Sequence, residues 1–278
     1  MRSKSGKWLL LVRIITLSFF LLLVLAPFYW LIITSLKPRL DILTTHIQYW
    51  PQHPTFDNYR DLWEDSNFVT FLKNSVFVSV GTGVFVTSLS ILGGYAMARY
   101  KFFGKSLVIY ALLLTQMIPG VLILVPTIIM YSKLNLMNSL GGLILVYIVG
   151  NIPFCLILMR SFFERIPVDL EEAALIDGCS KMRALVRIVI PLMLPGIIAT
   201  FVFAFIGAWN ELLAAVMFLS SDDLKTIPVG LAMFVQNYDV NWGVMTAGGV
   251  VALLPSLIMF AVVQRFVVEG LTDGAVKG

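Results

Sequence analysis

Charged residues are scarce in this chain. Of its 278 residues, 13% are charged and 59% are hydrophobic, whereas a soluble domain carries about 25% charged residues. The apolar runs take up most of the length, so no room remains for a soluble catalytic domain. The basic residues lie beside these runs, so the positive net charge indicates contact with membrane lipid and not with nucleic acid. The composition predicts an integral membrane protein.

Cysteine and histidine are also rare. Cys155 falls in an apolar run and Cys179 in an aqueous loop, so we expect no disulfide between them. His46 and His53 have no second group of metal-ligating residues near them, so no metal site is predicted. The sequence contains no nucleophile–base pattern either. It therefore predicts a protein that is not an enzyme and has no catalytic residue.

A phosphate-binding loop is the next feature that is missing. Gly104-Lys105-Ser106 resembles the end of such a loop, but Arg99 stands where the pattern requires a glycine. We interpret the segment as a positively charged turn on the cytoplasmic side. The chain itself is predicted to bind no ATP, no Mg²⁺ and no other cofactor.

Six apolar runs are long enough to cross about 30 Å of hydrocarbon. The first is too long for the core of a signal peptide and lacks a cleavage site, so it predicts a retained helix. The sequence thus predicts an all-α, polytopic membrane protein that forms a single transmembrane domain over residues 1–278. The predicted spans cover residues 12–35, 71–98, 107–131, 140–159, 195–219 and 244–267, with a cytoplasmic loop at 160–194.

The basic residues set the orientation. Fourteen of the 20 lysines and arginines fall on one side of the six predicted spans and six on the other. Because cytoplasmic loops carry the excess of basic residues, both termini are predicted to be cytoplasmic. Two long loops, residues 37–68 and 220–242, then lie outside. Loops of this length bind a partner or pack over the bundle, and the sequence leaves both open.

Proline and glycine interrupt several spans, for example at Pro119, Pro153 and the Gly93-Gly94 pair. Small residues allow close helix packing. Irregular backbone at membrane depth can also line a cavity. Both interpretations stand at this point.

Asp169 to Pro191 is a charged, helix-forming segment between two apolar runs. Asp169 suits an N-cap, with Glu172 three residues later. Gly178 is placed to end this helix in a left-handed conformation, and Ser180 can cap a second helix that runs to about Ile190. The pattern predicts a helix–glycine turn–helix on the cytoplasmic face. It would dock a soluble partner or lie on anionic lipid.

The spacing within this segment resembles a known signature. Glu172-Ala173-Ala174 is followed after three residues by Gly178, after nine more by Ile188, and finally by Pro191. This is the pattern of permeases in binding-protein-dependent ABC importers, with Ile190 where the pattern prefers leucine. By this resemblance the segment couples to an ATPase through Glu171, Glu172, Ala173, Ala174, Gly178, Ile188 and Pro191.

Other motifs extend the resemblance to the sugar-importer branch of that family. Phe56-Asp57-Asn58-Tyr59, Ala208-Trp209-Asn210-Glu211 and the ending Gly270-Leu271-Thr272-Asp273-Gly274 are similar to it. The chain resembles the smaller, six-span permease of maltose-type importers. The resemblance implies a type I importer permease fold, a location in the bacterial inner membrane and a carbohydrate substrate, such as an oligosaccharide. A permease for a non-sugar solute and a stand-alone secondary transporter remain alternatives.

The resemblance also implies partners. In this family two different permeases pair in the membrane, two ATPase subunits bind below with ATP and Mg²⁺, and an extracytoplasmic solute-binding protein docks above. The outer loop 220–242 corresponds to one that reaches the binding protein. Its polar residues Gln236, Asn237, Tyr238 and Asp239 are the predicted contacts.

Glu211 is the one acidic residue deep in an apolar run. An intramembrane carboxylate is costly and normally faces a cavity or a partner. Trp209 and Asn210 beside it could stack on and hydrogen-bond a sugar. The alternative for Glu211 is a structural hydrogen bond to another helix. Gln116 and Asn151 are further polar candidates for the substrate path.

Overall fold

The computed structural model describes residues 4–44, 46–64, 66–236 and 240–275, and helices without strands make up this part of the chain. The all-α prediction is therefore confirmed for the described residues. The chain divides into two compact units. Unit 1 comprises Met1–Phe68 and Leu231–Leu254, and unit 2 comprises Val69–Gly230 and Pro255–Gly278.

Unit 1 contains α1 (Lys4–Ser35), α2 (Arg39–Ile42), α3 (Asp57–Glu64) and the first part of α14 (Trp242–Ala275). None of the most apolar part of α1 is buried within the chain. A fully apolar helix that is left uncovered must face lipid or another membrane protein.

The motif around Asn58 contacts the C-terminal end of α1. The amide of Asn58 donates to the carbonyls of Ser35 and Lys37, both at 2.8 Å. The hydroxyls of Tyr59 and Ser35 lie 2.8 Å apart. At Gly243 an added Cβ would lie 2.2 Å from Oδ1 of Asn58, so α3 approaches the start of α14 closely. The asparagine and tyrosine of the sugar-importer motif are thus structural residues here.

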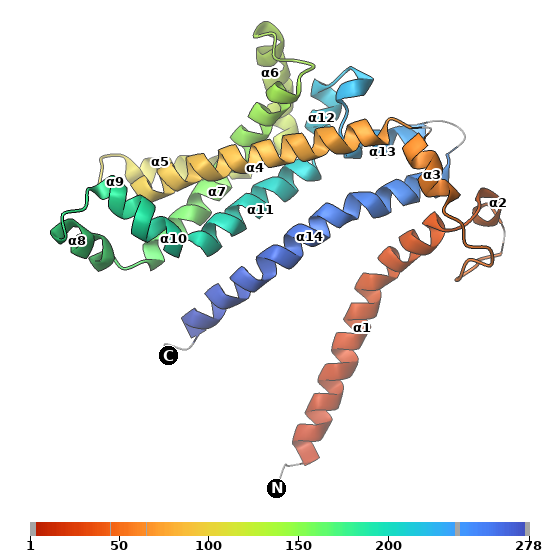
Figure 1. Cartoon of the computed structure of the whole chain (residues 1–278), viewed down its shortest axis with the longest axis horizontal. Helices are drawn as coiled ribbons and strands as arrows, with labels where there is room; N and C mark the ends of the chain where they lie inside the picture. Colours follow the sequence, from red (N-terminus) through yellow and green to blue (C-terminus); the bar gives the residue numbers. More distant parts are fainter. Residues whose placement is uncertain (1–3, 45, 65, 237–239, 276–278) are drawn as a thin grey trace. The chain divides into compact units, whose positions relative to one another are not determined.

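Unit 2 is built around α7, on which α5, α11 and α12 pack. Figure 1 shows α8 and α9 at one end of this unit, away from α6 and α12. Its elements are α4 (Phe68–Arg99), α5 (Lys105–Met117), α6 (Gly120–Lys133), α7 (Leu140–Arg165), α8 (Asp169–Ile176), α9 (Lys181–Ala184), the π-helix η1 (Leu185–Val189), α10 (Ile190–Leu192), α11 (Leu194–Trp209), α12 (Leu213–Phe218), the 3₁₀ turn η2 (Asp222–Leu224) and the start of α13 (Ile227–Gln236).

Glycine brings α4 against α7. A Cβ at Gly94 would lie 3.0 Å from the backbone nitrogen of Arg160, and one at Gly93 would lie 2.9 Å from Leu156. No larger side chain fits there without a shift of the helices. At this glycine pair the packing interpretation is the one that the structure supports.

Within the described part of the chain, four single helices are long and apolar enough to cross a membrane: Trp8–Ser35, Phe68–Arg99, Leu140–Arg165 and Trp242–Gln264. Two bent pairs raise the count to six if each pair is one span: Lys105–Met117 with Gly120–Lys133, bent by 100°, and Lys181–Leu192 with Leu194–Trp209, bent by 75°. These helices allow the six spans that the sequence predicts. The fifth, predicted as a continuous run over 195–219, differs because α11 ends at Trp209 and α12 begins only at Leu213.

The predicted outer loop 220–242 is largely not a loop. Its first part is held down by side chains, because Asn138 Oδ1 accepts from the backbone nitrogens of Ser220 and Ser221, both at 3.0 Å. The amide of Asn74 donates to the carbonyls of Asp223 and Lys225, both at 2.9 Å. The chain then forms α13. The three residues 237–239 lie outside the described residues.

Candidate functional site

The first broken span lies between α5 and α6. Ile118 is extended, with ψ of 123°, and Pro119 follows it. A residue before proline is pushed away from the helical region, and proline offers no N–H to continue α5. The two helices therefore meet at 100°. Gln116 lies just before this break.

A further interruption lies between α11 and α12, inside the predicted fifth span, and Glu211 occupies this break. Its carboxylate accepts from the backbone nitrogen of Ala214 at 3.0 Å to each oxygen and from that of Ala215 at 3.2 Å. The hydroxyl of Tyr147 on α7 donates to Oε2 at 2.8 Å. An acidic group at the start of a helix satisfies free N–H groups and the helix dipole. These donors explain how an apolar run accommodates a carboxylate.

A cavity of about 890 Å³ opens beside these two breaks, with α7 forming a further wall. Non-helical backbone at membrane depth is tolerated where it lines such a cavity. Gln116 and Glu211 line it from the two breaks, and Asn151 lines it from α7. Three of the five predicted substrate-path residues thus share one cavity within unit 2.

The lining is mostly apolar, with a few polar groups and no positive charge among the described residues. Asn151 Nδ2 donates to the carbonyl of Tyr147 at 2.8 Å, which holds its side chain in place. Thr115 and Thr127 add hydroxyls, and none of the described residues that line the cavity is Lys, Arg or His. The cavity therefore offers hydrogen-bonding groups and one carboxylate that is already bound by the chain.

The other two predicted path residues do not line this cavity. Trp209 is 2% exposed, and its ring stacks on Phe205 with centroids 5.7 Å apart. Asn210 is exposed but is not part of the lining. The absence of Trp209 and Asn210 from the lining could not be predicted from residue types, because adjacent residues at a helix end point in different directions. Only the position of the break decides which of them faces the cavity.

The segment Asp169–Pro191 forms the predicted helix–glycine turn–helix. Gly178 has φ of +82°. The backbone nitrogens of Gly178 and Cys179 donate to the carbonyls of Leu175 at 3.1 Å and Ala174 at 2.9 Å, which is a Schellman motif. Ser180 caps α9 by accepting from the backbone nitrogen of Arg183. The left-handed glycine and the second cap are confirmed.

The start of the segment differs from the prediction. The N-cap of α8 is Val168, one residue before Asp169, and no side chain caps this helix. The second helix also changes to a π-helix at Leu185–Val189. Met193 separates it from α11, where the chain turns by 75°.

The predicted coupling residues divide into two groups by exposure. Glu172, Ala173, Gly178 and Pro191 are exposed, whereas Ala174 and Glu171 are buried and Ile188 is half-buried. Apolar residues divide in the same way: Leu185 and Val189 pack into a core cluster with Met159 and Phe163, but Ile176, Met182 and Val186 are 87%, 63% and 53% exposed. The segment thus presents apolar side chains outward as well as inward.

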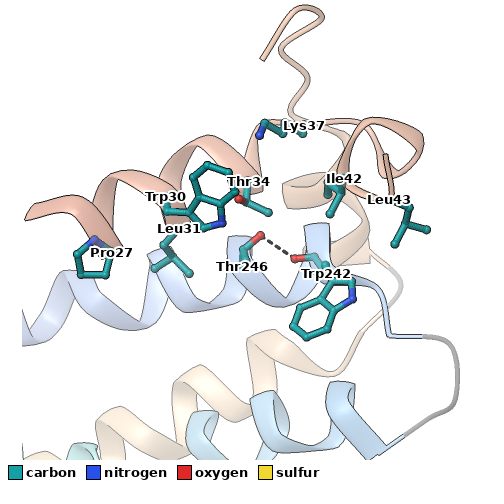
Figure 2. A pocket seen from close by; sticks show the side chains of 9 residues that line it. All are labelled: Pro27, Trp30, Leu31, Thr34, Lys37, Ile42, Leu43, Trp242 and Thr246. Atoms are coloured by element: carbon teal, nitrogen blue, oxygen red, sulfur yellow. Dashed lines mark hydrogen bonds between the residues drawn. The ribbon is translucent and has the colours of Figure 1, made fainter. Parts of the chain in front are cut away.

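A second cavity, of about 400 Å³, lies in unit 1 between α1, α2 and α14 (Figure 2). Lys37 is buried there. Its ammonium donates to the carbonyl of Gln48 at 2.5 Å and lies 4.8 Å from the centroid of the Trp30 ring. Burial lowers the pKa of Lys37, and Asp41 opposes the shift. Sequence reasoning missed this cavity, because it depends on how the outer loop folds back over α1.

The fold, with a cavity between broken helices that carries a few polar groups in an apolar lining, defines a polytopic membrane protein of the transport class. Comparison with known proteins gives the family. Residues 90–268 match the family model of the binding-protein-dependent transport system inner membrane component. The chain belongs to this family.

Relatives of established name cover nearly the whole chain. The sulfoquinovosyl glycerol transport system permease protein SmoH of Agrobacterium fabrum is 38% identical over 99% of this chain and 95% of its own. The trehalose transport system permease protein SugB of Mycobacterium tuberculosis is 35% identical over 91% and 93%. The diacetylchitobiose uptake system permease protein DasC of Streptomyces coelicolor is 34% identical over 91% of each.

Solved structures show the same fold. A bacterial ABC transporter involved in the import of the acidic polysaccharide alginate contains a chain with a TM-score of 0.84 at 23% identity, covering 95% of this chain and 98% of that one. A second structure, the alginate transporter in complex with its alginate-bound periplasmic protein, gives a TM-score of 0.69. The predicted type I importer permease fold is confirmed.

Proposed function

We propose that this chain is one permease subunit of an ATP-driven carbohydrate importer and forms half of the path through the membrane. The main support for this proposal is the cavity beside two breaks, one between α5 and α6 and the other between α11 and α12. Its volume of about 890 Å³ is typical of small-molecule sites. The names of the relatives support a carbohydrate, since trehalose and diacetylchitobiose are transported by systems whose permeases are similar to this one.

The cavity suits a neutral, hydroxyl-rich solute. Gln116 and Asn151 provide amides, which both donate to and accept from hydroxyls. The Glu211 carboxylate, by contrast, is occupied by Tyr147 and two backbone N–H groups. We therefore assign Gln116 and Asn151 to the substrate path. Glu211 shapes the cavity by holding the start of α12, and Trp209 supports it from the core.

The cytoplasmic segment is the proposed contact with two ATPase subunits. Ile176, Met182 and Val186 are exposed apolar side chains of this segment, and Glu172 of the same segment is exposed as well. Exposed apolar patches with a polar rim are typical of protein contacts. In this arrangement ATP and Mg²⁺ are held by the ATPases, and this chain holds no cofactor.

The remaining partners are a second, different permease and an extracytoplasmic binding protein. The uncovered apolar face of α1 supports the second permease as a partner, because such a face can pack against another membrane subunit as well as against lipid. For the binding protein, the proposed contact is Gln236–Asn237–Tyr238–Asp239, at the end of α13 and directly after it in the sequence. Both termini are placed in the cytoplasm by the distribution of basic residues.

The test uses the complete importer, co-expressed with its second permease, ATPase and binding protein and reconstituted into vesicles. Uptake of labelled trehalose and diacetylchitobiose is measured beside phosphate, a polyamine and an amino acid. We expect ATP-dependent uptake of a carbohydrate alone. Uptake of one of the other solutes without any carbohydrate would favour the non-sugar alternative.

Cavity variants then locate the path. Gln116→Ala and Asn151→Ala should raise the KM for uptake roughly five- to twentyfold, since each removes one to two hydrogen bonds of about 1 kcal/mol. Leu145→Ala is the matched control, because Leu145 is an exposed residue of α7 outside the lining. An unchanged KM in both cavity variants would place the path elsewhere.

The binding-protein contact is tested by deleting residues 237–239. In the reconstituted complex we expect the loaded binding protein to stimulate ATP hydrolysis less than in the wild type, relative to hydrolysis without it. A deletion variant that is stimulated as strongly as the wild type would show that this segment is not the contact.

A further inference from the structure

Two side chains of α4 hold the carboxylate of Glu171 in α8. Nε of Arg99 donates to Oε1 at 2.5 Å, and the hydroxyl of Tyr95 donates to Oε2 at 2.7 Å. The Arg99 and Glu171 side chains are only 9% and 10% exposed. Each carboxylate oxygen therefore has its own charged or polar donor from one helix, and we call this group the Glu171 clamp.

Arg99 joins a third element to the same clamp. Its Nη2 donates to the carbonyl of Ile166 at 2.9 Å, and Ile166 is the C-cap of α7. The last carbonyls of a helix have no partner within that helix, so this contact completes the end of α7. One guanidinium thus connects the cytoplasmic ends of α4 and α7 with α8.

The surroundings of the clamp are apolar. Tyr95 packs edge-on against Phe163 of α7, with ring centroids 5.5 Å apart, and it borders the core cluster that contains Leu185 and Val189. The Lys181 ammonium of α9 lies 5.6 Å from the ring centroid of Tyr100, directly after α4. Both helices of the cytoplasmic segment therefore contact the end of α4.

The contact between α8 and α4 is made by side chains, because no stretch of backbone links these two helices directly. The cytoplasmic segment is continuous in sequence with α7 and α11 only, so a push on α8 reaches those spans through the backbone. It reaches α4 through side chains. Beside the packing of α4 on α7 and on the cluster with Leu185 and Val189, the clamp adds a polar, directional contact between α4 and α8.

We infer that Glu171 is a positioning residue that makes α4 move together with α8, so that closure of the ATPases is transmitted to a span with no covalent link to the docking segment. This inference rests on the proposed function. It separates two adjacent glutamates: Glu172 is exposed and is available to the proposed ATPase partner, whereas Glu171 is 8% exposed and bonds within the chain. From α4 the turn at Tyr100–Gly104 leads directly into α5 and to the break that lines the cavity.

The test measures solute transported per ATP hydrolysed in purified, reconstituted complexes with equal ATPase content. In Glu171→Gln we expect this ratio to fall roughly three- to tenfold, because coupling elements commonly change coupling by that order, while hydrolysis continues. A purely structural role would lower the yield of complex but would leave the ratio of the assembled complexes unchanged. A wild-type ratio in Glu171→Gln would overturn the inference.

A milder variant covers the case in which Glu171→Gln does not assemble. Tyr95→Phe removes one hydroxyl and should lower the ratio by a smaller factor. Combined with Glu171→Gln it should add nothing, since the two residues act through one contact. A wild-type ratio in Tyr95→Phe, or fully additive losses in the double variant, would contradict the proposal.

Glu164→Gln is the matched control. Glu164 forms an ion pair with Arg160 within α7, with Arg160 Nη2 and Glu164 Oε1 2.8 Å apart, but both side chains are more exposed, at 24% and 44%. This variant should keep the wild-type ratio. If the wild-type complex itself lacks the ATPases or transports no carbohydrate, the proposed function fails; if it transports and Glu171→Gln stays coupled, only the clamp proposal fails.

Discussion

Glu211 lies on the cavity wall and also makes structural hydrogen bonds, two features that the sequence presents as alternatives. Its position in an apolar run predicts either a solute contact or a structural hydrogen bond. The structure places it on the cavity wall and occupies its carboxylate with Tyr147 and the N–H groups of Ala214 and Ala215. The two interpretations are therefore not exclusive. The Glu211 side chain lines the cavity and at the same time stabilises the start of α12.

Tyr147→Phe tests this role at the level of one hydroxyl. The variant leaves one carboxylate oxygen without its side-chain donor, and we expect a loss of about 1–2 kcal/mol in the free energy of unfolding. Thermal unfolding of the complex in detergent measures it. Tyr131→Phe is the control: Tyr131 lines the same cavity and is 5% exposed, but its ring packs edge-on against Phe218 and its hydroxyl is not bound to Glu211. Equal losses in both variants would show that the hydrogen bond from Tyr147 to Glu211 contributes no specific stability.

Among the elements, the cytoplasmic segment was the most predictable from sequence. Gly178 and Ser180 determine local geometry, and local geometry follows from residue type alone. The directions of Glu171 and Glu172 could not be predicted, because they depend on where α4 ends relative to α8. The break after Trp209 was missed for a similar reason. Its sequence stays apolar on both sides, and only the capping carboxylate marks it.

Gly178 itself gives a prediction for this element. A non-glycine residue at φ of +82° is strained by about 1–2 kcal/mol, and a Cβ there meets no atom within 4 Å, so the cost lies in the backbone alone. Gly178→Val should therefore shift the turn and reduce ATPase retention and uptake, while the protein still inserts into the membrane.

Gly178→Asn separates backbone strain from the mere loss of glycine. Asparagine tolerates the left-handed region far better than valine, so this variant should retain most of the activity. ATPase retention on an affinity column and uptake into vesicles are compared for both variants. Normal retention and normal uptake in Gly178→Val would show that the turn does not determine docking.

At the scale of the whole molecule, hydropathy predicts how many spans the chain has but not their shape. The apolar runs indicate six crossings, and the structure offers four straight helices and two bent pairs. The breaks at Ile118–Pro119 and after Trp209 border the cavity, whereas the 75° turn at Met193 follows the segment Asp169–Pro191. Neither the breaks nor the turn can be predicted from apolar length alone.

Orientation relative to the membrane is the last property that the basic residues predict. With Cys155→Ala and Cys179→Ser as background, single cysteines are introduced as Gln52→Cys and Ala275→Cys. Gln52 is an exposed residue of the segment between α2 and α3, and Ala275 ends α14. Since fourteen of the 20 lysines and arginines fall on the side of the termini, a membrane-impermeant maleimide should label position 52 in intact cells and position 275 only after permeabilisation. Labelling in the reverse order would invert the topology, and the segment Asp169–Pro191 would then face away from any cytoplasmic ATPase.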